Sequence, residues 1–223
     1  MAVSDPDRKR KAEGSDTEDY RKSSHQHIFK LLRMGYDRLD STSHANSEET
    51  DITGELVKFI QEIFDEPAAP RWCSHYAIHE DPAVNKPDVF GKRRKRLDIG
   101  FERTTSGKRY HFSFEAKRLS KDKSGAGEYF GKDGLGMFLS GEYSRESDEA
   151  GMLGYVQSDD LDHWAEKLSL YFNEHREAIK VRNNENWREA EEIRSFSHRY
   201  HSKHDRVGGL GPIAIFHVLL KFC

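Results

Sequence analysis

The chain has 223 residues, of which 35% are hydrophobic and 34% are charged, so it suits a single domain with a heavily charged surface. No apolar run is long enough to cross a bilayer, and the polar segment 1–11 is unlike a secretion signal, which argues against a membrane or secreted protein. The two cysteines, Cys73 and Cys223, lie far apart without a Cys-x-x-Cys pair, so we expect no disulfide framework or zinc knuckle and a cytoplasmic location.

The net charge of −3 hides an uneven distribution along the chain. Residues 92–123 contain twelve Lys or Arg and four acidic residues, a local net charge of +8. A local excess of this kind attracts phosphates, although a solvated basic loop has the same composition. The composition therefore allows nucleic acid as a partner without requiring it.

The first quarter of the chain divides into a polar segment and two predicted helices. Residues 1–25 are charged, rich in Ser and poor in large apolar side chains, so we expect them to be disordered. A short helix is expected around residues 27–39. The segment 49–64 has one apolar stripe at helical spacing, with Glu55 at its edge, and predicts an amphipathic helix.

Two strands are predicted with the greatest clarity in the middle of the chain. Residues 71–91 are irregular, with a strand near 72–78. Apolar residues then alternate with polar ones in residues 96–102 and again in residues 110–117, which is the period of a half-buried strand. A short link that ends in Ser-Gly joins the two runs and predicts an antiparallel hairpin.

The next segments suggest a loop, a strand and a helix. Residues 125–141 are rich in Gly and are expected to form a loop with a brief helix. Residues 152–157 resemble a short strand. Ser158, Asp159 and Asp160 favour the start of a helix, and apolar residues at helical spacing extend it to residue 172.

The C-terminal part is expected to contain a charged helix at residues 187–196, a His-rich segment, and a strand at 213–222 that is covered on both faces. Together the elements predict an α/β sandwich with a mixed sheet. The expected organisation is a tail at 1–25 and a single domain at 26–223, with a core at about 49–172 and a C-terminal helix and strand at 186–222.

Three side chains of the predicted hairpin carry a possible chemistry. Glu115 and Lys117 are two residues apart, so both point away from the aromatic side of their strand, and Asp98 falls opposite Glu115 or close to it. Neighbours across two strands have Cβ atoms about 4.5–5.5 Å apart, so the carboxylates repel each other unless a cation lies between them. A hard divalent ion fits this gap, and metal-assisted phosphodiester hydrolysis uses such a set of groups.

The run Arg96-Leu97-Asp98-Ile99-Gly100, followed by Phe114-Glu115-Ala116-Lys117, resembles the PD-(D/E)xK, or restriction-endonuclease-like, nuclease superfamily. The resemblance spans about residues 49–172. It departs from the motif before Asp98, where Leu97 replaces the proline; a literal Pro-Asp at 87–88 lacks the alternation of a strand.

The resemblance implies a restriction-endonuclease-like α/β/α sandwich with a central mixed β-sheet. It implies that Asp98, Glu115 and Ala116 form a site for Mg²⁺, with Mn²⁺ as the alternative, and that Lys117 positions the water. Glu55 on the preceding helix and Gln157 after the next strand are the further catalytic candidates. The residues expected to contact nucleic acid, more likely DNA than RNA, are Arg93, Arg94, Lys95, Arg96, Arg118, Lys121 and Lys123.

Among small members of that superfamily a role in bacterial restriction or anti-phage defence is the leading expectation, with a homodimer or an activating partner protein as further expectations. The alternative is a silent module of the same fold that binds nucleic acid or a partner. The three central residues are also compatible with an exposed cross-strand salt bridge. His198, His201 and His204, three residues apart, are a weaker metal-site candidate on one helix face, and His217 is expected to be a core histidine.

Overall fold

The computed structural model describes residues 6–84, 91–104, 109–121 and 125–223. Its helices are α1 (Pro6–Tyr36), α2 (Glu49–Asp65), α3 (Ala126–Tyr129), α4 (Leu135–Leu139) and α5 (Leu161–Glu174), with 3-10 turns η1 (Ser41–His44), η2 (Arg71–His75) and η3 (Gly91–Arg93). Its strands are β1 (Tyr76–Glu80), β2 (Ile99–Arg103), β3 (Tyr110–Leu119), β4 (Glu149–Val156), β5 (Arg188–Glu189), β6 (Arg199–His204) and β7 (Ile213–Lys221).

The strands form one seven-stranded mixed sheet in the order β1-β2-β3-β4-β7-β6-β5. β3, β4 and β7 are parallel to one another, and the pairs β1–β2, β2–β3, β7–β6 and β6–β5 are antiparallel. The predicted hairpin is confirmed, because β2 and β3 are antiparallel neighbours with Ile99 opposite Phe114. The predicted final strand is also confirmed as β7, which is buried along nearly its whole length.

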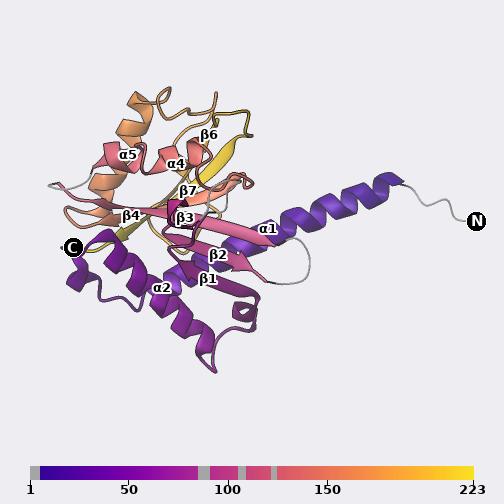
Figure 1. Cartoon of the computed structure of the whole chain (residues 1–223), viewed down its shortest axis with the longest axis horizontal. Coiled ribbons are helices and arrows are strands. Elements are labelled where there is room, and N and C mark those ends of the chain that lie inside the picture. Colours follow the sequence, from indigo (N-terminus) through magenta and orange to yellow (C-terminus); the bar gives the residue numbers. More distant parts are fainter. Residues whose placement is uncertain (1–5, 85–90, 105–108, 122–124) are drawn as a thin grey trace, which may run out of the picture.

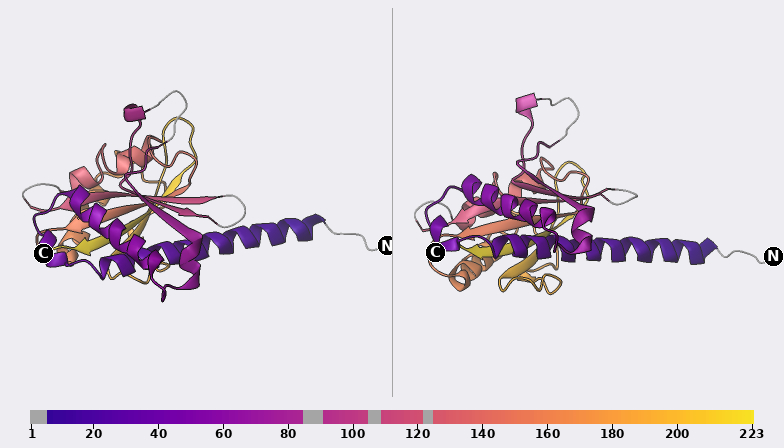
Figure 2. Two further views of the ribbon diagram at one scale, coloured as in Figure 1. Left: turned by 60° about the horizontal axis from the view of Figure 1, so that its bottom comes forward. Right: turned by 90° about the horizontal axis from the view of Figure 1, so that it is seen from below.

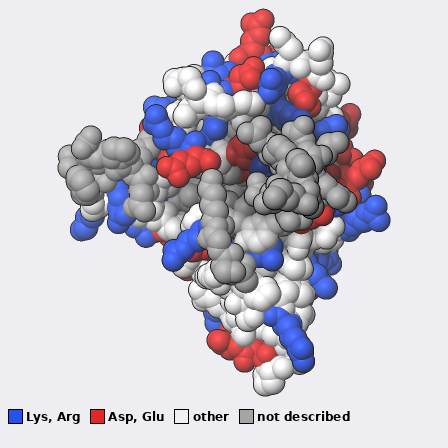
Figure 3. Space-filling model, turned by 90° about the vertical axis from the view of Figure 1, so that its right-hand side faces the viewer, with Lys and Arg blue, Asp and Glu red and all other residues white. Residues whose placement is uncertain are grey.

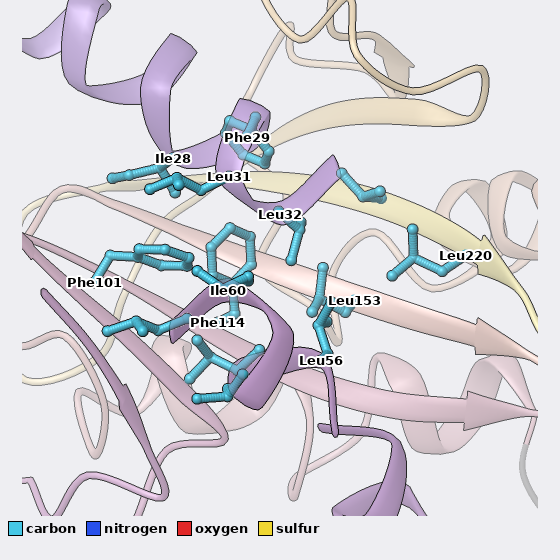
Figure 4. Close-up of a cluster of buried hydrophobic side chains, with 14 of the residues drawn as sticks. Ile28, Phe29, Leu31, Leu32, Leu56, Ile60, Phe101, Phe114, Leu153 and Leu220 are labelled. Atoms are coloured by element: carbon cyan, nitrogen blue, oxygen red, sulfur yellow. The ribbon is translucent and has the colours of Figure 1, made fainter. Parts of the chain in front are cut away.

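Helices cover both faces of the sheet, which confirms the predicted α/β sandwich (Figure 1). α1 and α2 pack on one face, where Leu56, Ile60 and Phe114 belong to a single buried cluster (Figure 4). α3, α4 and α5 pack on the other face around a second cluster that includes Phe138 and Trp164. Each face of a central strand therefore buries apolar side chains, as expected of a sheet between two helical layers.

Two predicted helices match the structure closely. α2 runs from Glu49 to Asp65, and its apolar stripe is buried against the sheet, as the helical spacing predicts. α5 begins after Asp160, whose side chain accepts a hydrogen bond from the backbone N–H of His163 at 2.7 Å. This side-chain cap satisfies a backbone donor that the first turn of a helix leaves without a partner.

The expectation of a disordered segment at residues 1–25 does not hold for residues 6–25, because α1 already begins at Pro6. The part of α1 after residue 18 is tied to the body by polar contacts: Arg21 binds Asp148 at 2.5 Å and Glu149 at 2.8 Å. Further on, Ile28, Phe29, Leu31 and Leu32 are fully buried. Once such an anchored turn exists, each further helical residue adds a hydrogen bond at little entropic cost, so a polar sequence can continue the helix.

The predicted helix at 187–196 is wrong. This segment forms the two-residue edge strand β5 followed by turns, and Ala190 donates a backbone hydrogen bond to Arg199 of β6. Ile193 and Phe196 are buried in the cluster beneath α1 and α2, so tertiary packing overrides the helical propensity of the charged residues.

The His-rich segment is the strand β6, so its histidines do not line a helix face. His201 and His204 are three residues apart on this strand and therefore face opposite sides of the sheet. His217 is buried, as expected of a core histidine, and both of its ring nitrogens have partners, Tyr129 at 3.0 Å and Ser202 at 2.7 Å.

None of the helices in the described part of the chain combines the length and the apolar composition that spanning a bilayer requires.

Candidate functional site

The candidate site lies where β3 extends beyond the start of β2. Continuing the register of the hairpin, Asp98 stands opposite Glu115, one position before β2 begins at Ile99. The carboxylate of Asp98 accepts a hydrogen bond from the backbone N–H of Ala116 at 2.6 Å. A side chain thus takes the place of a strand partner at this edge of β3.

Glu115 and Lys117 share the face of β3 that is turned away from α1 and α2. Their neighbours Phe114 and Ala116 belong to the cluster beneath those helices, and side chains alternate along a strand. The ammonium of Lys117 lies 2.9 Å from Oε1 of Glu115. The structure therefore brings Asp98, Glu115 and Lys117 together as the alternation along the two strands predicts.

The structure adds Glu49, the first residue of α2, to this group. Its Oε1 lies 3.0 Å from Nζ of Lys117, and its Oε2 accepts a hydrogen bond from the backbone N–H of Arg118 at 3.1 Å. Ala116 and Arg118 are two residues apart, so their N–H groups point to the same edge of β3. Asp98 binds the first of these groups and Glu49 binds the second.

Glu55, the residue expected to assist from the helix, does not reach this group. Its carboxylate lies 2.6 Å from Nε2 of His44, and its side chain is 39% exposed. Six residues separate it from Glu49, which places it on a different side of α2 at 100° per residue. The one sequence signal for Glu49 was its place in the first turn of the predicted helix, whereas the edge of the apolar stripe pointed to Glu55.

Burial governs the protonation of the acidic side chains. Glu115 is 5% exposed, and burial together with the nearby Asp98 carboxylate raises its pKa to about 8, against the lowering effect of Lys117. Burial also raises the pKa of Asp98 and that of Glu49 above their ordinary values, although Lys117 opposes both shifts. Three carboxyl groups, of which Glu115 is buried and the other two are half-buried, therefore lie near one ammonium group.

The ammonium of Lys117 is held in the charged form. Burial lowers its pKa, but the carboxylates of Glu115 and Glu49 outweigh burial and leave the pKa above the ordinary value. Its third contact is the backbone carbonyl of Ala116, which accepts a hydrogen bond at 2.6 Å. Nζ of Lys117 is thus surrounded by three oxygen atoms.

One buried oxygen of this group lacks a partner, which fits a cation. Among the described residues, Oε2 of Glu115 is buried and has no hydrogen-bonding partner while the carboxyl group is ionised, whereas the protonated group can donate to the carboxylate of Asp98. Burying a carboxylate oxygen without a hydrogen bond costs free energy, and a hard divalent cation binds such oxygens. No group of three or more His, Cys, Asp or Glu side chains in the described chain has the spacing of a ready-made metal site. A cation here would depend on Asp98, Glu115 and backbone oxygens such as that of Ala116.

Gln157 positions the segment in front of α2. It follows β4, and its amide nitrogen donates to the backbone carbonyls of His44 and Ser47, both at 2.8 Å. This segment leads directly into Glu48 and Glu49. Gln157 therefore contacts the segment that precedes α2, where its two hydrogen bonds position the start of that helix.

The basic residues lie on two separate segments. Beyond the sheet, residues 81–84 and 94–98 form a narrow antiparallel ribbon, with a backbone bond from Val84 to Lys95 at 2.8 Å and from Asp81 to Asp98 at 3.0 Å. Figure 2 shows this segment, with η3 near its end, standing out from the body. The second strand of the ribbon runs without interruption into Asp98.

Within the ribbon, Lys95 is exposed and Arg96 pairs with Asp81. Arg93 lies in η3, and Arg94 follows it. On the second segment, Arg118 pairs with Glu48 at 2.8 Å and Lys121 binds Asp159 at 2.5 Å.

Lys123 lies outside the described residues. Among the described residues visible in Figure 3, Lys and Arg are interspersed with Asp and Glu and do not form one continuous patch.

Comparisons with protein-family models, with curated proteins and with solved structures give no match to this chain.

Proposed function

We propose that the chain is a metal-dependent nuclease of the restriction-endonuclease-like class, which hydrolyses phosphodiester bonds in nucleic acid, with DNA as the favoured substrate. The observation that carries the proposal is the convergence of Asp98, Glu115 and Lys117 at the free edge of β3, with one buried carboxylate oxygen left without a partner. The order of the elements, a helix, a hairpin, and a strand followed by a helix, supports the same class.

Asp98, Glu115 and the backbone of Ala116 are the groups that would hold the ion, Mg²⁺ or alternatively Mn²⁺. When bound, a divalent ion stabilises negative charge on a phosphate and lowers the pKa of water. The ammonium of Lys117 supplies a fixed positive charge that can orient a water molecule and stabilise the charge that builds up on the phosphate. Hydrolysis then forms a bond from the water oxygen to phosphorus and breaks the bond to the leaving oxygen, which takes up a proton.

The basic ribbon supports nucleic acid as the substrate. Lys95 is exposed on the strand that ends in Asp98, so a backbone bound along the ribbon would come close to the acidic group. A role in bacterial restriction or anti-phage defence, a homodimer and activation by a partner are proposed on the resemblance of the motif alone.

The test is cleavage of supercoiled plasmid with Mg²⁺ and with Mn²⁺ by the native chain, by Asp98→Ala and by Lys117→Ala. We expect the native chain to cut and both variants to lose at least about 100-fold in rate, as removal of a group that stabilises the transition state does. Cleavage that persists in both variants contradicts the assigned residues. Plasmid binding without cleavage under either ion indicates the silent binding module instead.

A further inference from the structure

The ammonium of Lys117 occupies a closely fitted cradle of oxygen atoms. It lies 2.6 Å from the carbonyl of Ala116, 2.9 Å from Oε1 of Glu115 and 3.0 Å from Oε1 of Glu49. The side chain is only 14% exposed, so the contacts are not those of a mobile surface lysine. The cradle satisfies all three N–H donors of the ammonium group.

Two of the three oxygen atoms belong to groups that the proposed metal centre would use. The carbonyl of Ala116 and the carboxylate of Glu115 would be ligands of a divalent ion, and both already bind Lys117. The other oxygen of Glu115 has no partner, yet it belongs to the same carboxylate, so an ion there would still lie next to the ammonium. Two cations at such separation repel each other strongly in a buried site.

The third oxygen atom offers the lysine a second position. Glu49 lies at the start of α2, outside the set that would hold the ion, and its carboxylate is also fixed by the backbone N–H of Arg118. An ammonium that leaves Glu115 and Ala116 can therefore keep its pairing with Glu49.

We propose that Lys117 is the resident counter-ion of this acidic group and that it exchanges places with the divalent cation. In the ion-free protein its ammonium pairs with the carboxyl groups of Glu115 and Glu49. Entry of the ion drives the ammonium off Glu115 and Ala116 and towards Glu49, which frees N–H donors for a water molecule or a phosphate. The inference rests on the proposed metal centre and adds that the ion itself makes the lysine available for chemistry.

The first measurement is Mn²⁺ binding without nucleic acid, followed by the electron paramagnetic resonance signal of the unbound ion. Lys117→Met removes the competing charge, so we expect it to bind Mn²⁺ about tenfold more tightly than the native chain, or more. The matched control is Lys58→Met, which changes the net charge equally at a lysine of α2 whose side chain is 67% exposed, and it should bind like the native chain.

Equal or weaker Mn²⁺ binding by Lys117→Met, with clear binding by the native chain, overturns the exchange and leaves the nuclease proposal intact. If neither chain binds the ion at millimolar concentration, the exchange and the metal centre are both overturned.

The second measurement follows the native chain, in case Lys117→Met does not fold, and uses a conservative variant only to assign the signal. In ¹⁵N-labelled protein, the hydrogen-bonded ammonium of Lys117 should give a slowly exchanging side-chain signal, identified by its loss in Lys117→Arg. We expect this signal to shift or broaden during titration with Mg²⁺, in step with occupancy of one site. A signal that stays unchanged while other resonances report a saturated site overturns the exchange.

Discussion

Glu49 and Glu55 lie on the same helix, six residues apart, and the structure gives them different partners. Glu49 binds the ammonium of Lys117 and a backbone amide of β3, whereas Glu55 pairs with His44. Both are glutamates of α2, so the pair separates the effect of position from that of composition. Sequence alone did not distinguish them, because the edge of an apolar stripe says little about which turn of a helix faces a strand end.

Glu49→Gln should therefore reduce the rate of plasmid cleavage by about 10–100-fold, because a hydrogen bond to a charged group contributes about 1.5–3 kcal/mol. Glu55→Gln should stay within about twofold of the native rate. Initial rates at saturating plasmid, with thermal unfolding to verify the fold of each variant, test the pair. A larger loss of rate in Glu55→Gln than in Glu49→Gln would show that Glu55, and not Glu49, is the acidic residue of α2 that assists cleavage.

Glu115 is expected to destabilise the ion-free fold as the pH rises. Its pKa is raised from 4.5 to about 8 in the folded chain, so the folded state binds its proton more strongly than the unfolded state does. This contribution to stability is complete below pH 4.5 and is lost as the pH rises through 8. The residue that best suits a cation therefore lowers the stability of the fold at high pH when no cation is bound.

Glu115→Gln removes this loss, because the amide has no proton to give up. Between pH 6.5 and 8, with a chelator present, the free energy of unfolding of the native chain should fall relative to the variant by up to about 1.4 kcal/mol per pH unit. Urea unfolding of both chains at the two pH values measures the difference. Parallel pH dependence in the two chains would show that Glu115 does not carry the buried proton.

At the scale of elements, the two strands of the hairpin were predicted correctly, whereas the helix predicted at residues 187–196 was wrong. The alternation in residues 96–102 and 110–117 predicted β2, β3 and even the opposition of Asp98 and Glu115, because a period of two leaves only one face for each side chain. Residues 187–196 have good helix formers, but Ile193 and Phe196 are buried and β5 pairs with β6. Long-range pairing of this kind leaves no local signal.

The ribbon beside Asp98 is the element that we expect to contact nucleic acid. Lys95 is exposed on it and Lys92 is exposed in the neighbouring η3, and the ribbon is an antiparallel pair that a groove of duplex DNA can accommodate. Each phosphate contact contributes about 0.9 to the slope of log affinity against log salt concentration.

The double variant Lys92→Ala/Lys95→Ala should bind duplex DNA more weakly and lower this slope by up to about 2. The control is Lys58→Ala/Lys167→Ala, which removes the same charge from exposed positions on α2 and α5. Fluorescence anisotropy at several salt concentrations, in a chelator that prevents cleavage, gives both quantities. An unchanged slope in the first variant would place the DNA elsewhere.

At the scale of the whole molecule, the order of layers followed from the sequence, whereas the extent of α1 did not. Composition suggested disorder up to residue 25, yet α1 already contacts the sheet from about residue 20 onward. The guanidinium of Arg103 lies 4.0 Å from the ring centre of Tyr20 and 2.9 Å from the hydroxyl of Ser24. The polar segment has no apolar stripe of its own, so its order depends on partners on β2 and β4, more than 70 residues away in the chain.

Two shortened chains test where the folded body begins. Removal of residues 1–17 leaves all of these contacts in place and should leave the free energy of unfolding close to that of the native chain. Removal of residues 1–25 also takes away Arg21 and His25, both of which bind Glu149, whose pKa is lowered to about 2 by these partners against the opposing effect of burial. A half-buried carboxylate that loses its partners is costly, so we expect a loss of about 2–4 kcal/mol in urea unfolding at neutral pH. Arg21→Ala should reproduce part of that loss in the full-length chain, which connects the effect to the ion pair. Equal stability of the two shortened chains would mean that residues 18–25 contribute nothing to the fold, as a disordered segment would.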